Sequence, residues 1–224
     1  LHLPFGVNKP MDVFGDGWQG YTEKIKEDWN KKVKNEDTVI LAGDFSWATY
    51  LEDTYKDFEY LCALPGKKIM LKGNHDYWWS SLSKINAVYE SDDMNFIQNG
   101  YFTYGDYAIC GSRGWLCPNE VKFDSNDMKI YRREVLRLEM SIQSAIQNGC
   151  NNIIVITHYP PTNDQLEESE FTKLYEKYNV KKVIYGHLHG KESFEMGLKG
   201  IRNGIEYILA SSDYLDFKLI KVLD

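Results

Sequence analysis

The sequence has no long apolar run, no closely spaced cysteine pair and no stripe of basic residues. Its uninterrupted apolar segments are far shorter than the roughly 18 residues that a transmembrane helix needs, so we expect no membrane partner. The four cysteines are Cys62, Cys110, Cys117 and Cys150. Without a Cys-x-x-Cys pair they predict neither a zinc knuckle nor a disulfide framework, and free thiols favour a cytoplasmic protein.

The charge distribution argues against a long nucleic acid as a partner. The chain carries 33 acidic and 26 basic residues, a net charge of −7, and its basic residues are scattered. Electrostatic capture of a nucleic-acid backbone is therefore not expected. Small phosphate ligands stay compatible with this charge, because bound metal cations reverse the local sign at a site.

Internal repeats and low-complexity linkers are absent as well. A chain of 224 residues that is 43% hydrophobic can bury a large core, so we expect one α/β domain over residues 1–224. An initiator methionine is also missing, because the sequence starts at Leu1. We expect the natural N-terminus to lie before this residue.

Four apolar segments are typical of strands that are buried on both faces of a sheet: residues 38–42, 67–71, 153–156 and 182–185. Segments with helical spacing of apolar residues separate them, and the longest covers residues 125–148. Gly105-Asp106 predicts a hairpin between residues 102–104 and 107–110. From residue 193 onward we expect only strands, with residues 194–196 and 207–209 joined through a turn at Asn203-Gly204, and a last strand over 217–222.

Each buried segment ends in a polar side chain that can bind a metal or carry a proton. In chain order these are Asp44, Asn74 with His75, His158, and His187 with His189. In open parallel sheets the ligand site lies beyond the carboxyl ends of the strands, so we expect these side chains to converge. All five histidines of the chain lie at such strand ends or at its start.

Imidazole, carboxylate and amide ligands without thiolate suit divalent ions such as Mn, Fe or Zn. Six candidate ligands exceed one tetrahedral zinc site. Two divalent metal ions that share a bridging carboxylate account for six ligands better than one zinc ion does. Such a pair holds a phosphoryl group and activates a water molecule for in-line attack. The pattern therefore predicts a dinuclear metal centre that acts on phosphate.

Four short motifs together resemble those of the calcineurin-like metallophosphoesterases. They are Gly43-Asp44, Gly73-Asn74-His75-Asp76, Thr157-His158 and Gly186-His187-Leu188-His189. The resemblance covers nearly the whole chain and implies a four-layer αββα sandwich of two mixed sheets, with helices on both outer faces. It also implies hydrolysis of a phosphomonoester or phosphodiester by a hydroxide held between two metal ions.

The resemblance implies a role for each motif residue. Asp44 would bridge the two metal ions. The other ligands would be His2 and His189 at one ion, and Asn74, His158 and His187 at the other. His75 would donate to the phosphoryl or leaving-group oxygen, with Asp76 orienting it, since an imidazole beside two cations can hold a proton if a carboxylate offsets their charge.

One motif departs from the family pattern. The first family motif is Asp-x-His, whereas only Leu1 precedes His2 in this sequence. The Asp ligand and the first strand would therefore precede Leu1, and we expect the chain to be trimmed at its N-terminus.

Several alternatives stay open at this point. Asp44 could cap a helix, and Asp76 could pair with a cation. Arg113 either binds a substrate phosphate through two hydrogen bonds of its guanidinium or forms a surface salt bridge. The expected substrate is a small phosphorylated molecule or phosphodiester, selected by the loops over residues 6–21 and 111–126. A nuclease, a cyclic-nucleotide phosphodiesterase and a non-catalytic scaffold are the alternative functions.

Overall fold

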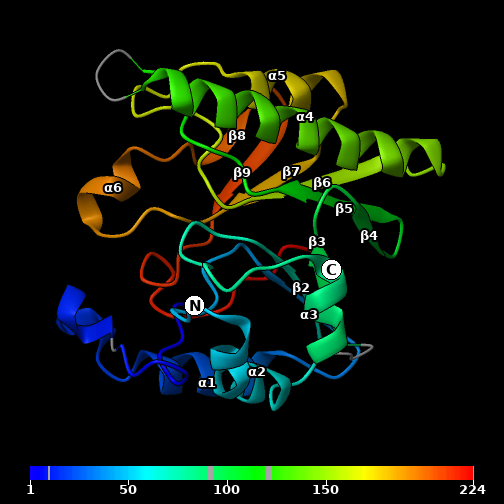
Figure 1. Cartoon of the computed structure of the whole chain (residues 1–224). Helices are drawn as coiled ribbons and strands as arrows, with labels where there is room; N and C mark the ends of the chain where they lie inside the picture. The colour runs from blue at the N-terminus through cyan, green and yellow to red at the C-terminus, as the bar shows by residue number, and fades with distance from the viewer. Residues whose placement is uncertain (10, 90–92, 120–122, 224) are drawn as a thin grey trace.

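The computed structural model describes residues 1–9, 11–89, 93–119 and 123–223. Two β-sheets lie face to face between two layers of helices (Figure 1). One helical layer contains α4 (Ser125–Gln147) and α5 (Glu170–Lys177), and the other contains α1 (Tyr21–Lys32), α2 (Tyr55–Cys62) and α3 (Leu82–Val88). This arrangement confirms the expected αββα sandwich. None of the described helices is long and apolar enough to cross a membrane.

The smaller sheet is entirely parallel in the part of the chain that the structure describes. Its order is β1 (Thr38–Leu41), β2 (Lys67–Leu71) and β3 (Met94–Ile97). The larger sheet is mixed and has the order β4-β5-β6-β7-β9-β8. Its strands are β4 (Tyr101–Tyr104), β5 (Tyr107–Ser112), β6 (Asn152–Thr157), β7 (Lys182–Tyr185), β8 (Gly200–Arg202) and β9 (Ile205–Leu209). We expected two mixed sheets. The larger sheet is mixed, whereas the smaller sheet is parallel within the described residues.

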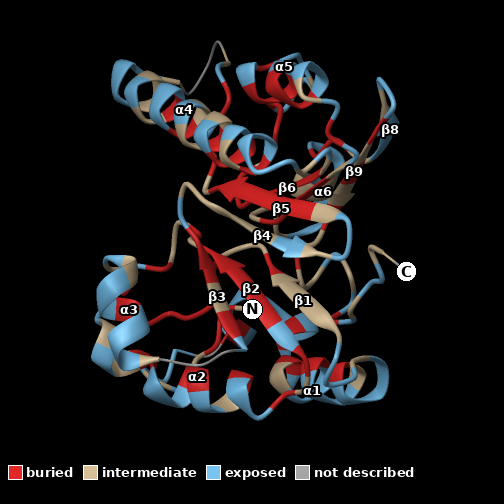
Figure 2. Cartoon of the chain, turned by 90° about the vertical axis from the view of Figure 1, so that its right-hand side faces the viewer, coloured by how far each residue is buried: buried red, intermediate tan, exposed pale blue. Residues whose placement is uncertain are grey.

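The apolar runs are continuous because both faces of the central strands are buried. In β2, Met70 packs toward the helical layer of α1, α2 and α3, whereas Ile69 and Leu71 fill the space between the sheets. In β6, Val155 packs under α4 and α5, whereas Ile154 faces the other sheet. Figure 2 shows this burial along β2 and β5.

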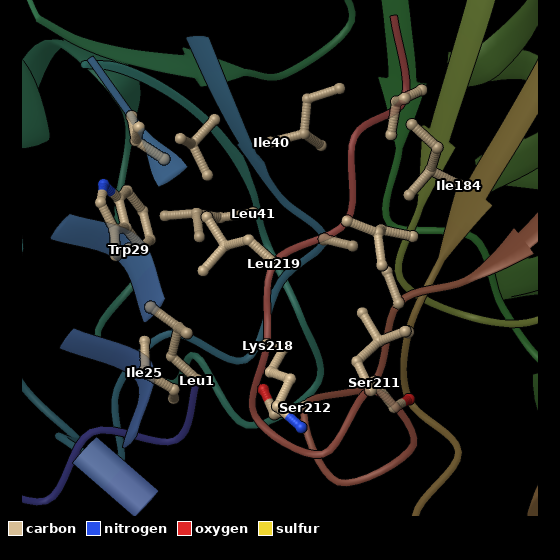
Figure 3. A pocket seen from close by; sticks show the side chains of 18 of the residues that line it. Leu1, Ile25, Trp29, Ile40, Leu41, Ile184, Ser211, Ser212, Lys218 and Leu219 are labelled. Carbon is tan, nitrogen blue, oxygen red and sulfur yellow. The ribbon is translucent and has the colours of Figure 1, made fainter. Parts of the chain in front are cut away.

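Strand β1 lies at an edge of the smaller sheet, and only Leu41 of its four residues is buried. It borders an apolar cavity of about 710 Å³ between the sheets (Figure 3). Trp29 and Leu219 line this cavity on the side of α1, where the backbone N–H of Leu219 bonds to Asp28, and Ile184 lines it from β7. The strand that the resemblance places before Leu1 lies outside this chain and stays a prediction.

Two expectations for the C-terminal part are wrong. Residues 191–195 form the short helix α6 (Lys191–Glu195), which follows Gly190 at a positive φ of 82°. Residues 217–222 form no strand, because Phe217 leaves the extended conformation with φ of 58° and packs on Trp18 with ring centroids 5.1 Å apart. The predicted turn at Asn203-Gly204 is confirmed, and it joins β8 to β9.

Candidate metal centre

The carboxyl ends of β1, β2, β6 and β7 bring five of the six predicted ligands together at one edge of the sandwich. His2 joins them from the start of the chain, where its backbone N–H donates to the carbonyl oxygen of Asp44 at 2.8 Å. The ligands form two groups around Asp44, which lies three residues after the end of β1. The first group contains His2 and His189, and the second contains Asn74, His158 and His187.

In the first group, the Nε2 atoms of His2 and His189 are 3.1 Å apart. The carboxylate atom Oδ2 of Asp44 lies 3.6 Å from Nε2 of His2. On the other side of the His189 ring, Nδ1 lies 2.8 Å from Oδ1 of Asp213. An ionised carboxylate only accepts hydrogen bonds, so Nδ1 carries the proton and Nε2 is directed toward His2.

In the second group, Oδ1 of Asn74 lies 2.6 Å from Nε2 of His158 and 2.9 Å from Nδ1 of His187. The two imidazole nitrogens are 3.2 Å apart. The Nδ1 atom of His158 donates to the carbonyl oxygen of Ala42 at 2.8 Å. This bond leaves Nε2 of His158 as the atom with a free lone pair, which is the state that a metal ligand needs.

Asp44 connects the two groups. Its Oδ2 lies 3.3 Å from Nε2 of His158 as well as 3.6 Å from Nε2 of His2. Its other oxygen, Oδ1, accepts from the backbone N–H of His75 at 2.8 Å. One carboxylate oxygen thus faces both sets of ligands, as a bridging ligand requires.

The chemistry and spacing of these atoms fit divalent metal ions. Nitrogen and oxygen ligands bind such ions at about 2.0–2.2 Å, so neighbouring ligand atoms lie about 3 Å apart. The separations of 2.6 to 3.6 Å agree with this value. Within the described residues, no three His, Cys, Asp or Glu side chains form a complete cage by themselves. The assignment of the ligands to two ions around Asp44 therefore stays a prediction, which the short distances between the donor atoms support.

Burial holds the ligands in the protonation states that metals require. Desolvation, followed by the charge of His158, lowers the pKa of His187 to about 3, and desolvation also lowers the pKa of His2. Burial opposes ionisation of Asp44, but His158 and His2 hold the pKa of this carboxyl below its usual value. The lowered pKa values of His2 and His187 favour their neutral imidazoles, and that of Asp44 favours its ionised carboxylate, so these three groups present lone pairs to a metal ion.

The backbone is strained at three of the ligands. His2, Asp44 and His187 have φ values of 54°, 51° and 71°, in the left-handed region that non-glycine residues rarely adopt. Close approach of two loops adds a further constraint, because a Cβ atom on Gly73 would lie 2.0 Å from Oδ1 of Asp44. Only glycine fits at this position. Gly73, in the motif after β2, therefore allows Asp44 to occupy its place in the motif after β1.

His75 lies beside the ligand groups and outside them. Its ring centroid is 5.7 Å from that of His2 and 4.6 Å from that of Trp47. The ring is half-buried, and its nitrogens hydrogen-bond to none of the described residues. Burial lowers the pKa of this imidazole, while the charge of Asp44 opposes that shift. The His75 ring thus lies next to the ligand groups, with nitrogens that have no partner among the described residues.

Asp76 is hydrogen-bonded to the loops that follow β1 and β2. Its buried carboxylate accepts from the backbone N–H groups of Gly73 at 2.7 Å and Phe45 at 2.8 Å, and from Nε1 of Trp78 at 3.0 Å. A fourth bond comes from the N–H of Ser46 at 3.2 Å. No hydrogen bond joins it to the His75 ring among the described residues. Asp76 therefore ties together the two loops that follow β1 and β2 and forms no ion pair with a described residue, while its role in orienting His75 stays a prediction.

Arg113 forms no salt bridge within the described residues, although its backbone oxygen accepts from the N–H of His158 at 3.0 Å. It follows β5 at the same edge as the ligands. Residues 10 and 120–122 of the two predicted specificity loops lie outside the described residues.

Asp213, which orients His189, was missed by sequence reasoning because it lies in an irregular segment after β9, where no periodic pattern marks it.

Comparison with known proteins gives a family and a fold. A family model described as calcineurin-like phosphoesterase matches residues 2–191. The crystal structure of TT1561 of Thermus thermophilus has a TM-score of 0.57 at 13% sequence identity, and the match covers 86% of this chain and 84% of that one. The protein of unknown function AQ665 from Aquifex aeolicus has a TM-score of 0.47 at 21% identity, over 89% of this chain and 80% of that one. No curated protein matches the sequence.

Proposed function

The chain belongs to the calcineurin-like phosphoesterase family, and we propose that it hydrolyses phosphoester bonds of small molecules with the help of two divalent metal ions. The observation that carries this proposal is the position of Asp44, whose Oδ2 faces His2 at 3.6 Å and His158 at 3.3 Å. We assign His2 and His189 to one ion, and Asn74, His158 and His187 to the other. Bound divalent ions supply positive charge for the phosphoryl oxygens and lower the pKa of a bound water molecule.

The residues around this centre prepare it for that chemistry. The bond from His158 to the Ala42 carbonyl and the bond from His189 to Asp213 fix which ring nitrogen is free. His75 is the donor to the leaving-group oxygen in this proposal, because its ring lies beside the ligands with no hydrogen-bond partner among the described residues. Burial lowers its pKa, and the negative charges of Asp44 and Asp76 oppose the loss of its proton. Loss of a proton from His75 to that oxygen makes the departing group neutral.

The four thiols are free, which agrees with a reducing cytoplasm as the place of this reaction. The acidic net charge of −7 favours small substrates over long nucleic acids. The identity of the metal, among Mn, Fe and Zn, is open to direct measurement.

The test combines metal analysis with a substrate screen. The purified chain, stripped with a chelator and incubated with Mn, Fe or Zn, should retain about two ions per chain and hydrolyse p-nitrophenyl phosphate or bis-p-nitrophenyl phosphate. Asp44→Asn should lower both the metal content and the rate. For the full-length protein, fewer than about one ion per chain together with no hydrolysis of either ester would exclude the enzyme and favour a non-catalytic scaffold.

A further inference from the structure

Two exposed aromatic side chains lie next to the candidate metal centre. Phe14 is the last residue of the short 3-10 helix η1 (Met11–Phe14), and its side chain is 60% exposed. Tyr77 follows His75 by two residues and is 64% exposed. An aromatic ring that stays in contact with water has apolar surface to offer to a ligand. These two rings therefore merit comparison with the position of the proposed proton donor.

A row of ring contacts joins the two exposed rings to His75. The centroid of the Tyr77 ring lies 6.2 Å from that of His75, and the two planes meet at 81°. The His75 ring is in turn 4.6 Å from that of Trp47. The rings of Trp47 and Phe14 are parallel within 10°, with centroids 6.3 Å apart. Aromatic rings attract each other at centroid distances of about 4.5–7 Å, so the four rings form a continuous row that contains His75.

Local hydrogen bonds hold the two ends of this row in place. Nε1 of Trp47 donates to Sδ of buried Met11 at 3.1 Å, which fixes η1 against the indole. The backbone N–H of Tyr77 donates to the carbonyl oxygen of His75 at 2.8 Å. Asp76, between these two residues, accepts from N–H groups of the loop that follows β1. Rings that are ordered before a ligand arrives lose little conformational entropy on binding.

The indole of Trp47 is enclosed, because its side chain is only 8% exposed. The His2 ring stacks on it with centroids 4.9 Å apart, and the Lys9 ammonium lies 3.8 Å from its centroid. Trp47 thus connects the outer ring of Phe14 to a candidate metal ligand. The aromatic surface that remains open to a ligand is that of Phe14 and Tyr77.

Contact with His75 places this row on the leaving-group side, because His75 is the donor to the leaving-group oxygen in the proposed function. We infer that Phe14 and Tyr77 form an aromatic subsite, which binds a planar ring carried by the leaving group of the substrate. This inference rests on the proposed function and narrows it: the preferred substrates are phosphoesters of arylmethyl alcohols or of nucleosides. Both leaving groups have a π face that can stack on an aromatic side chain, whereas a saturated ring has none.

The test compares leaving groups that differ in the planarity of one ring. For benzyl phosphate against cyclohexylmethyl phosphate, the metal-loaded full chain should show a kcat/KM about 3- to 10-fold higher for the planar ring. The two alcohols are similar in size and acidity, so the ease of leaving does not decide this ratio. AMP against ribose 5-phosphate makes the corresponding comparison for a nucleobase. A preference for benzyl phosphate assigns an arylmethyl leaving group, and a preference confined to AMP assigns a nucleoside.

Two variants connect this preference to the rings. Phe14→Leu and Tyr77→Leu keep an apolar side chain at an exposed position and remove the ring, so each should reduce the preference by about 2-fold or more. Tyr55→Leu makes the same change on α2, where the ring is 65% exposed and contacts neither His75 nor Trp47 within the described residues, and it should leave the preference unaltered. Equal kcat/KM values within both substrate pairs, or a preference that Phe14→Leu and Tyr77→Leu both leave unchanged, would overturn the subsite.

Binding of inert analogues separates the subsite from the proposed function. In 2-phenylethylphosphonate and 2-cyclohexylethylphosphonate a CH₂ group replaces the ester oxygen, so neither is hydrolysed. Calorimetry with the full chain, incubated with and without Mn, compares these two compounds. If no ester is hydrolysed, but 2-phenylethylphosphonate or AMP binds about 3- to 10-fold more tightly than its partner and Phe14→Leu or Tyr77→Leu reduces the difference, the proposed function fails and the subsite stands. If no ester is hydrolysed and neither planar compound is preferred, the subsite is overturned together with the proposed function.

Discussion

The carboxylate of Asp213 accepts a hydrogen bond of 2.8 Å from Nδ1 of His189. Its second oxygen accepts from the backbone N–H of Gly190 at 2.9 Å, so the carboxylate is fixed at both oxygens. Burial alone would raise the pKa of Asp213, but the bond from His189 holds it below its usual value. Asp213 thus stays ionised and keeps the Nε2 lone pair of His189 available to a metal ion.

From this contact we predict that Asp213→Asn lowers the affinity for one of two bound metal ions by about 10- to 100-fold. The amide accepts with one atom only, so the ring of His189 loses its fixed orientation. Metal titration followed by calorimetry measures the effect, and thermal unfolding of the metal-free protein should change little. Asp216→Asn is the control, because this exposed carboxylate pairs with Lys218, away from the ligands. Equal metal affinities in all three proteins would show that Asp213 has no positioning role.

Gly73 gives a second prediction. A Cβ atom at this position would lie 2.0 Å from Oδ1 and 2.2 Å from the backbone nitrogen of Asp44. Because these atoms are buried and bonded, Gly73→Ala should reduce the free energy of unfolding by at least about 2 kcal/mol and also weaken metal binding. Gly100→Ala, with no atom within 4 Å of its new Cβ, should change stability by less than about 0.5 kcal/mol. Urea unfolding of the metal-free proteins measures both, and a stable Gly73→Ala variant with normal metal content would contradict the packing argument.

The third prediction concerns His75. Replacement by alanine should lower kcat by about 100-fold or more while the metal content stays the same, because the ring lies beside the ligands and is not one of them. The loss should be larger for an alkyl phosphate than for p-nitrophenyl phosphate, since a nitrophenolate leaves without a proton. Unchanged turnover of the alkyl ester would remove His75 from the mechanism.

Asp76→Asn is the informative contrast to His75→Ala. Its carboxylate binds four N–H donors of the β1 and β2 loops, so the variant should lose stability before any effect on proton transfer is seen. A large drop in the melting temperature, together with a loss of kcat that is the same for alkyl and nitrophenyl esters, would separate the two roles.

Much of the fold could be predicted from the sequence because double burial leaves a clear signal. The runs in β2 and β6 are apolar over most of their length since alternate side chains enter different cores. The place of the candidate site could be predicted from the same strands, because the carboxyl ends of parallel strands meet at one edge of a sheet. The hydrogen bonds of Asp76 could not be predicted, because most of its donors are backbone N–H groups, which no residue pattern reveals. The tail around Phe217 was mistaken for a strand because its apolar residues pack singly against other elements.

The last prediction concerns Asp57, a buried carboxyl that accepts from the backbone N–H of Phe5 at 2.9 Å and from the hydroxyl of Ser46. Burial raises its pKa to about 6, although these bonds act in the opposite direction. In the unfolded chain the value is about 3.9, so between about pH 4 and 6 the folded state binds more protons. The contribution of Asp57 to the free energy of unfolding therefore falls as the pH rises through this range.

His187, with a pKa lowered to about 3, acts in the opposite sense, since its unfolded form takes up the proton as the pH falls below about 6.5. The effect of Asp57 must therefore be read as the difference between the wild type and Asp57→Asn, which leaves His187 in place. In urea unfolding of the metal-free proteins, the wild type should gain stability relative to the variant on going from about pH 7 to about pH 4. Asp106→Asn, in the exposed turn between β4 and β5, should show no such trend. A difference that is constant across this pH range would mean that the Asp57 carboxyl is ionised at its usual pH in the folded protein.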